Sequence, residues 1–106
     1  MKVLITGGAG FIGANLVRKL ETLSEVTEVV VVDDLSFGCR ENLDGTSATL
    51  LEGSVLDEKL LRQAIDGAST VVHLAARSSV PRSIAEPMAT HEVNATGGAL
   101  VLEAAR

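Results

Sequence analysis

A glycine-rich segment, Thr6-Gly7-Gly8-Ala9-Gly10-Phe11-Ile12-Gly13, follows directly after the apolar run Val3–Thr6. A short, uninterrupted apolar run of this kind predicts a strand that is buried on both faces. After the glycines, apolar residues recur at helical spacing and predict an amphipathic helix. The buried side of this helix is predicted to carry Ile12, Leu16, Leu20 and Leu23. A strand, a glycine loop and a helix in this order favour an α/β fold.

Three further apolar runs, Val29–Val32, Thr49–Leu51 and Thr70–Leu74, predict additional strands. Their lack of strict alternation is typical of strands covered by helices on both faces, as in parallel sheets. Strands and helices alternate along the chain, which predicts right-handed crossovers. The predicted fold is therefore α/β, with a parallel sheet of about four strands and flanking helices.

Two later helices are predicted between and after these strands. The first contains Leu60, Leu61, Ala64 and Ile65, with Asp57 as its N-cap and Gly67 just beyond its end. The second is expected to run from Pro87 to Arg106. The Gly97-Gly98 pair weakens the middle of this last helix, because glycine is a poor helix former.

Length, charge and cysteine content limit the classes of protein to consider. The chain of 106 residues is long enough for one domain, so residues 1–106 are expected to share a single core. The formal net charge of −5 opposes binding to nucleic acid and to anionic membranes. The apolar runs are too short to span a bilayer, and Met1 leads directly into a strand rather than a signal peptide. The single cysteine, Cys39, excludes an internal disulfide and favours a reducing, cytoplasmic location.

The spacing of Gly7, Gly10 and Gly13 is suited to a phosphate-binding loop. Gly7 would permit a tight turn, Gly10 the approach of backbone amides to a pyrophosphate, and Gly13 the close packing of the helix on the strand. The positive end of the helix dipole would then face the phosphates. The alternative is a strand-to-helix turn that binds no ligand, which a glycine loop by itself does not exclude.

An acidic residue, Asp33, ends the second predicted strand 20 residues after Gly13. A carboxylate in this position accepts hydrogen bonds from the adenosine ribose hydroxyls of a dinucleotide. It also repels a 2′-phosphate, so NAD is predicted in preference to NADP. Arg40 is either a partner for a 2′-phosphate or a solvated loop charge. Asp34 either positions the ribose loop or is an ordinary loop residue.

Motifs along nearly the whole chain resemble those of the extended short-chain dehydrogenases. Beyond the glycine spacing, Asp33-Asp34-Leu35-Ser36-Phe37-Gly38 is similar to the family's ribose loop, and Val72-His73-Leu74-Ala75-Ala76 to its fourth-strand signature. The pattern continues in order with Ser79-Val80, Ser83, Pro87 and Asn94. The motifs resemble most the NAD-dependent epimerase/dehydratase branch, typified by UDP-galactose epimerase. This resemblance implies a partial Rossmann fold with strand order 3-2-1-4, NAD as cofactor, and a nucleotide sugar as substrate of a complete form.

The resemblance also implies which residues bind the cofactor. Phe11 and Ile12 would offer backbone amides, and Ser54 and Val55 would flank the adenine. The full predicted set comprises Gly7, Gly10, Phe11, Ile12, Gly13, Asp33, Asp34, Ser54, Val55, Leu74, Ala75 and Ala76.

The chain departs from the family pattern at Ser54, where members usually carry an aspartate that accepts a hydrogen bond from the adenine amino group. A serine hydroxyl also accepts a hydrogen bond, so weakened adenine binding is expected. His73 and His91 have no acidic or thiol cluster near them in sequence, so no metal site is predicted and His73 is assigned a structural role. Asn94 resembles the family's buried asparagine, which bridges backbone groups.

The chain contains no tyrosine. Family members use a tyrosine four residues before a lysine for acid/base chemistry, so no catalytic residue is predicted and the isolated chain is expected to be inactive. Three hypotheses remain: the N-terminal portion of an epimerase or dehydratase, a stand-alone dinucleotide-binding or assembly module, and a scaffold that binds no cofactor. The helical pattern is still open at Arg106, without a C-cap, which favours a truncated unit.

A homo-oligomer is predicted from the apolar surfaces that this fold would leave exposed. In the implied strand order, Thr70–Leu74 lies at a sheet edge, and an unpaired apolar edge is a template for pairing with another chain. Leu100, Val101 and Leu102 are consecutive in the last predicted helix and cannot all face one sheet. A symmetric contact between two copies would cover both surfaces.

Overall fold

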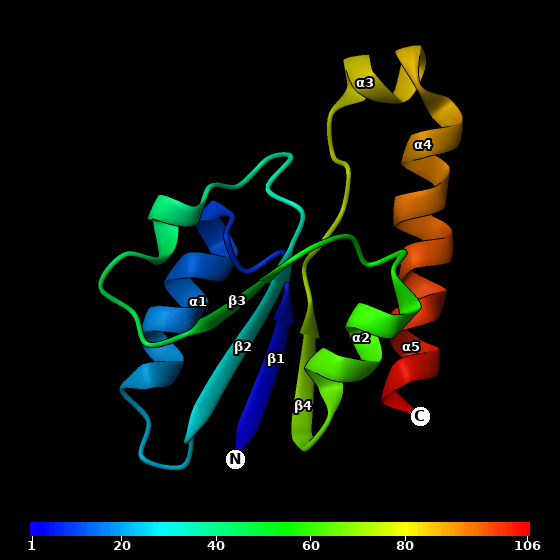
Figure 1. The fold of residues 1–106 in the computed structure, drawn as a ribbon. Coiled ribbons are helices and arrows are strands. Elements are labelled where there is room, and N and C mark those ends of the chain that lie inside the picture. The colour runs from blue at the N-terminus through cyan, green and yellow to red at the C-terminus, as the bar shows by residue number, and fades with distance from the viewer.

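The computed structural model describes all 106 residues, and its centre is a four-stranded parallel sheet (Figure 1). The strands are β1 (Lys2–Thr6), β2 (Glu28–Asp33), β3 (Thr49–Glu52) and β4 (Ala68–His73). Their order is β3-β2-β1-β4, which confirms the predicted fold class and topology. Thr6 pairs with Val32 on one side and with His73 on the other, so these carboxyl ends meet at one edge of the sheet.

β4 lies at the edge of the sheet, as predicted, but its bounds differ from the prediction. It begins at Ala68 and ends at His73, so Leu74 belongs to the following loop. The pairing stops there because Thr6 is the last residue of β1 and offers no further strand partner. The segment after β4 is therefore free to turn across the carboxyl edge of the sheet.

Helices cover both faces of the sheet. The helical elements are α1 (Phe11–Glu21), η1 (Arg40–Leu43), α2 (Glu58–Ile65), α3 (Val80–Ala85), α4 (Pro87–His91), η2 (Glu92–Gly97) and α5 (Gly98–Ala105). Val3 and Ile5 pack with α1, whereas Leu4 between them packs with α2. Successive residues of a strand point to opposite faces, so β1 is buried from both sides. None of the helices combines the length and apolar character needed to cross a membrane.

The buried side of α1 differs from the predicted stripe. Its fully buried residues are Gly13, Ala14 and Val17, while Ile12 is 70% exposed and Leu23 also lies at the surface. Leu16 and Leu20 do pack against the core, as predicted. The difference arises because a Cβ on Gly13 would lie 2.5 Å from the Gly7 carbonyl oxygen, so this small face sets how the helix sits on the loop.

The α2 helix follows the prediction closely. The Asp57 side chain accepts a hydrogen bond from the Leu60 amide at 3.1 Å, which confirms Asp57 as the N-cap. Gly67, just beyond the helix, has a φ of +77°. Leu61 and Ala64 are the residues of this helix that become fully buried.

The C-terminal helix is not the single regular helix expected from Pro87 to Arg106. It consists of α4, the π-helical turn η2 and α5, which follow one another as one rod (Figure 1). A further short helix, α3, precedes it and was not predicted. Gly97 is buried at the end of η2, where a Cβ would lie 2.7 Å from Val55 Cγ2. The glycine thus allows the rod to approach the loop after β3.

Candidate functional site

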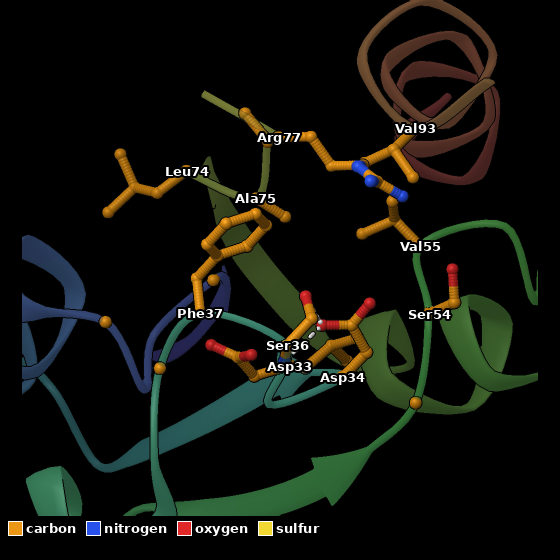
Figure 2. A pocket seen from close by; sticks show the side chains of 16 residues that line it. Asp33, Asp34, Ser36, Phe37, Ser54, Val55, Leu74, Ala75, Arg77 and Val93 are labelled. Carbon is orange, nitrogen blue, oxygen red and sulfur yellow. Dashed lines mark hydrogen bonds between the residues drawn. The ribbon is translucent and has the colours of Figure 1, made fainter. Parts of the chain in front are cut away.

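A pocket of about 130 Å³ lies at the carboxyl edge of the sheet (Figure 2). Five segments surround it: the glycine loop after β1, the loops that follow β2, β3 and β4, and η2. Nine of the predicted cofactor residues line it, namely Gly7, Gly10, Asp33, Asp34, Ser54, Val55, Leu74, Ala75 and Ala76. Because the pocket is smaller than the roughly 300–1,000 Å³ of typical small-molecule sites, it encloses only part of a dinucleotide-sized ligand.

The glycine loop forms one rim of this pocket. Gly7 has a φ of +73°, and its amide donates to the Val32 carbonyl at 2.8 Å. A Cβ on Gly7 would lie 2.7 Å from the Ala75 nitrogen, so the residue is required both for the turn and for the approach of the β4 loop. Gly13 was predicted to provide close packing of the helix on the strand. It does provide close packing, but its neighbours are Gly7 and Gly8 of the loop.

Phe11 and Ile12 begin α1 beside the pocket without lining it. Their side chains are 82% and 70% exposed, and neither they nor Gly13 belong to the pocket wall. The predicted contribution of Phe11 and Ile12 comes from their backbone amides, which lie in the first turn of the helix, where amides have no intrahelical acceptor. This turn contains no acidic residue that would oppose an anion.

Asp33 lies beneath the pocket and connects two of its rims. Its carboxylate accepts the Ala9 amide at 3.0 Å and the Leu35 amide at 2.8 Å, and the residue is only 8% exposed. Leu35 has a φ of +63°, a conformation that is unfavourable for a side chain of this size. The Asp33 carboxylate therefore holds both the glycine loop and a strained turn in place. It keeps lone pairs that can accept further hydrogen bonds.

Asp34 and Arg40 each form contacts that bear on the alternatives left open by the sequence. Asp34 accepts hydrogen bonds from the amide and the hydroxyl of Ser36, at 2.9 and 2.6 Å, and so shapes the loop after β2. Arg40 forms an ion pair with Glu52 at 2.5 Å and does not line the pocket. The structure thus gives Asp34 a role in shaping the loop after β2. Arg40 forms its ion pair outside the pocket.

The hydroxyl of Thr6 joins the ends of β1 and β4 beneath the pocket wall. It accepts the amides of Leu74 and Ala75, at 3.1 and 3.2 Å, and lies 2.6 Å from His73 Nδ1. The Leu74 amide also donates to the Thr6 carbonyl at 3.0 Å, so backbone and hydroxyl of Thr6 together hold the start of the β4 loop. The contact with Thr6 gives His73 a structural role, as predicted, and desolvation by burial lowers the pKa of His73 from 6.5.

The stability of the fold is expected to fall as the pH drops below about 6.5, in part through His73. A lowered pKa in the folded chain means that the unfolded chain binds a proton more readily, so this contribution is present above the unfolded pKa and is lost in acid. In His73→Asn, an amide oxygen can still accept from Thr6 but does not titrate. Urea unfolding at about pH 7.5 and about pH 5.5 should show a smaller difference in unfolding free energy for the variant. Equal differences for both proteins would exclude this role.

Asn94 fixes the loop that follows β4. Its amide donates to the Arg77 carbonyl at 2.9 Å, and its side-chain oxygen accepts the Arg77 amide at 2.7 Å. This is the predicted bridge between backbone groups, although Asn94 itself is exposed rather than buried. The bridge connects η2 to the segment that carries Leu74, Ala75 and Ala76.

The pocket also contains residues that the sequence prediction did not include. They are Val32, Ser36, Phe37, Gly38, Gly53, Arg77 and Val93. Ser36, Phe37 and Gly38 lie within the motif that resembled a ribose loop, so their presence follows from that motif. Phe37 also lies 4.6 Å from the Arg82 guanidinium, a cation–π contact that joins the β2 loop to α3. Arg77 and Val93 line the pocket because of tertiary packing, and no sequence pattern indicated them.

The sequence model of the NAD dependent epimerase/dehydratase family matches residues 3–106. The chain belongs to this family. Among curated relatives it is 36% identical to UDP-glucose 4-epimerase of Erwinia amylovora and 35% identical to dTDP-glucose 4,6-dehydratase of Mycolicibacterium smegmatis. Both alignments cover 100% of this chain and 33% of the relative, so the chain spans about one third of their length.

Solved structures of epimerases and dehydratases resemble the fold throughout. UDP-glucose 4-epimerase of Thermotoga maritima with UDP-glucose superimposes with a TM-score of 0.88 at 39% identity, over 99% of this chain and 34% of that protein. The Thermus thermophilus UDP-glucose 4-epimerase complex with NAD has a TM-score of 0.86 at 38% identity, over 98% and 33%. The dTDP-glucose 4,6-dehydratase of Streptomyces venezuelae, with NAD and TYD bound, has a TM-score of 0.88 at 38% identity, over 99% and 35%.

Proposed function

We propose that this chain forms the adenosine-binding half of an NAD site in a nucleotide-sugar epimerase or dehydratase. The observation that carries the proposal is the position of the pocket, with the glycine loop on its rim and the buried Asp33 beneath it. The chain leaves β1 toward β2 and β3 on one side and returns to β4 on the other, so the pocket lies at a reversal of strand order. Open α/β sheets bind ligands outside the carboxyl ends of their strands at this point.

The residues around the pocket fit a dinucleotide. The free lone pairs of Asp33 would accept the adenosine ribose hydroxyls, and the amides of Phe11 and Ile12 would face the pyrophosphate, which Gly10 would allow to approach. Ser54 and Val55 would border the adenine, while Leu74, Ala75 and Ala76 would lie along the rest of the cofactor. When bound, the nicotinamide would accept and return a hydride. The residues of this chain would bind and orient the cofactor through its adenosine half.

NAD is proposed over NADP because of the charges near the ribose subsite. The Asp33 carboxylate is buried and would repel a 2′-phosphate. Arg40, the cation that the sequence offered as a partner for such a phosphate, is paired with Glu52. A 2′-phosphate would therefore meet a negative charge, with Arg40 engaged outside the pocket.

Calorimetric titration of the 106-residue chain with NAD, NADP and ADP-ribose tests this proposal. We expect NAD to bind more tightly than NADP. ADP-ribose should bind nearly as tightly as NAD, because the pocket encloses only part of the cofactor and lies on the adenosine side. If neither NAD nor ADP-ribose binds at millimolar concentration, the proposal is wrong.

The isolated chain is proposed to be catalytically incomplete. The tyrosine that family members use for acid/base chemistry has no counterpart in these 106 residues. We therefore expect no interconversion of UDP-glucose and UDP-galactose in the presence of NAD. The alternative function is a stand-alone dinucleotide-binding or assembly module, and it predicts the same binding but no role in a longer enzyme.

We propose a cytoplasmic location and a small-molecule partner rather than nucleic acid or membrane. Cys39 is free and exposed, and thiols of this kind persist in reducing compartments. The net charge of −5 disfavours polyanionic partners.

A homo-oligomer is expected because two neighbouring features of the fold lack a cover. β4 has no strand on its outer side, and Leu102 on α5 is 74% exposed while its neighbour Val101 is 4% exposed. Pairing of two β4 edges or packing of two α5 helices would bury these surfaces. Light scattering at micromolar concentration should give a mass above that of the 11.0 kDa monomer. A stable monomer mass at all concentrations would exclude the oligomer.

A further inference from the structure

The side chain of Arg77 is an unusual component of the pocket wall. It is only 19% exposed, and one guanidinium nitrogen, Nη2, pairs with Glu86 at 2.8 Å. Its Nε is buried and has no hydrogen-bond partner within the protein. A buried N–H without an acceptor is unfavourable, so this donor is suited to an acceptor supplied by a ligand.

The surroundings of Arg77 suggest what that ligand group is. Figure 2 shows the guanidinium beside Val93 and Val55, on the side of the pocket that Ser54 borders. The two valines form an apolar wall, which suits a flat ring that is stripped of water. The Ser54 hydroxyl accepts the Leu56 amide at 3.0 Å and so shapes the turn before α2, while its proton and second lone pair stay free for a ligand. A heteroaromatic ring with acceptor nitrogens could pack against the two valines and also accept the hydrogen bond from Arg77 Nε.

The position of Arg77 is set independently of any ligand. Asn94 holds its backbone through two hydrogen bonds, at 2.7 and 2.9 Å, and Glu86 holds the far end of its side chain. A side chain fixed at both ends loses little rotamer freedom when a ligand binds. Such a residue can therefore discriminate between bases rather than merely attract anions.

We propose that Arg77 recognises the base of the dinucleotide, with its Nε–H donating to a purine ring nitrogen at the edge of the base. This inference rests on the proposed NAD site and adds a specificity-determining residue to it. The preference for a purine over a pyrimidine diphosphate should then depend on Arg77.

Three variants separate base recognition from a structural role. Arg77→Lys keeps the positive charge and the reach toward Glu86 but places a methylene where Nε stands, and Arg77→Met removes the charge as well. Glu86→Gln breaks the ion pair while it leaves the Nε–H in place. Thermal unfolding of each variant would show that it is folded before binding is compared.

Calorimetric titration with ADP-ribose, ADP and UDP provides the test. We expect Arg77→Lys and Arg77→Met to weaken ADP-ribose binding about 10-fold, as for loss of a charge-assisted hydrogen bond, and to reduce the preference for ADP over UDP. Glu86→Gln should retain both the affinity and the preference. Wild-type affinity and preference in folded Arg77→Lys, or their loss in Glu86→Gln, would overturn the inference while leaving the NAD site intact. If ADP-ribose does not bind the unmodified chain, the proposed function fails and this inference fails with it.

Discussion

Replacing Asp33 with alanine is expected to weaken NAD binding about 10- to 150-fold, the equivalent of roughly 1.5–3 kcal/mol. The proposed hydrogen bonds from the ribose hydroxyls to the carboxylate are lost in this variant. The Ala9 and Leu35 amides also lose their acceptor, so the glycine loop and the turn at Leu35 are no longer held together. Calorimetric titration with NAD measures the change, with the free energy of unfolding as a check on folding.

The matched control for Asp33→Ala is Asp34→Asn. Asp34 is the adjacent carboxylate and also lines the pocket, but it is exposed and bonds to Ser36 within its own loop. Its amide replacement still offers an oxygen to the Ser36 amide, so we expect NAD affinity to change by less than about threefold. Unchanged affinity in Asp33→Ala would remove Asp33 from the site. Equal losses in both variants would indicate that the geometry of the loop after β2, and not a specific contact of Asp33, governs binding.

The largest loss of stability is expected from Gly7→Ala. An alanine at a φ of +73° costs about 1–2 kcal/mol in backbone strain, and its Cβ would lie 2.7 Å from the Ala75 nitrogen. The overpacking, which forces the neighbouring backbone to shift, costs about 1–3 kcal/mol more. The expected loss of unfolding free energy is therefore about 2–5 kcal/mol. Urea unfolding measures this loss, and the displaced β4 loop should also weaken NAD binding.

Gly45→Ala separates the two causes of this loss. Gly45 has a φ of +80°, but no atom lies within 4 Å of the position that its Cβ would occupy. This variant therefore carries only the backbone strain, and we expect it to lose about 1–2 kcal/mol and to bind NAD normally. If Gly7→Ala proves no more destabilising than Gly45→Ala, the close contact between the glycine loop and Ala75 is not a constraint on the fold.

The parts of the fold that could be predicted are those determined by local sequence. The four strands are short apolar runs, and the turn at Gly7 and the cap at Asp57 each depend on one residue type in one position. The strand order came from family resemblance, because apolar patterns do not reveal which parallel strands are neighbours. Nine pocket residues were predicted in the same way, from motifs that lie at the carboxyl ends of strands.

The features that were missed depend on contacts between distant segments. Ile12 and Leu23 have the spacing of a buried stripe, but the approach of Gly13 to the glycine loop turns a neighbouring face of α1 inward. The π-helical turn η2 ends where Gly97 packs against Val55, 42 positions earlier in the chain. Arg77 lines the pocket with its backbone bonded to Asn94 and its guanidinium bonded to Glu86, 17 and 9 positions later in the chain. Helical periodicity carries no information on such contacts.

The central claim is that the adenosine part of NAD lies in the pocket between Asp33 and the loop after β3. Amide chemical shifts of the ¹⁵N-labelled chain, measured during titration with ADP-ribose, test this claim most directly. We expect the largest changes at Gly8, Gly10, Leu35 and Val55, and none at Gly45 or Gly67, which lie in open turns away from the pocket lining. Saturable changes centred on α2 and α5, or no changes at millimolar ADP-ribose, would contradict the account.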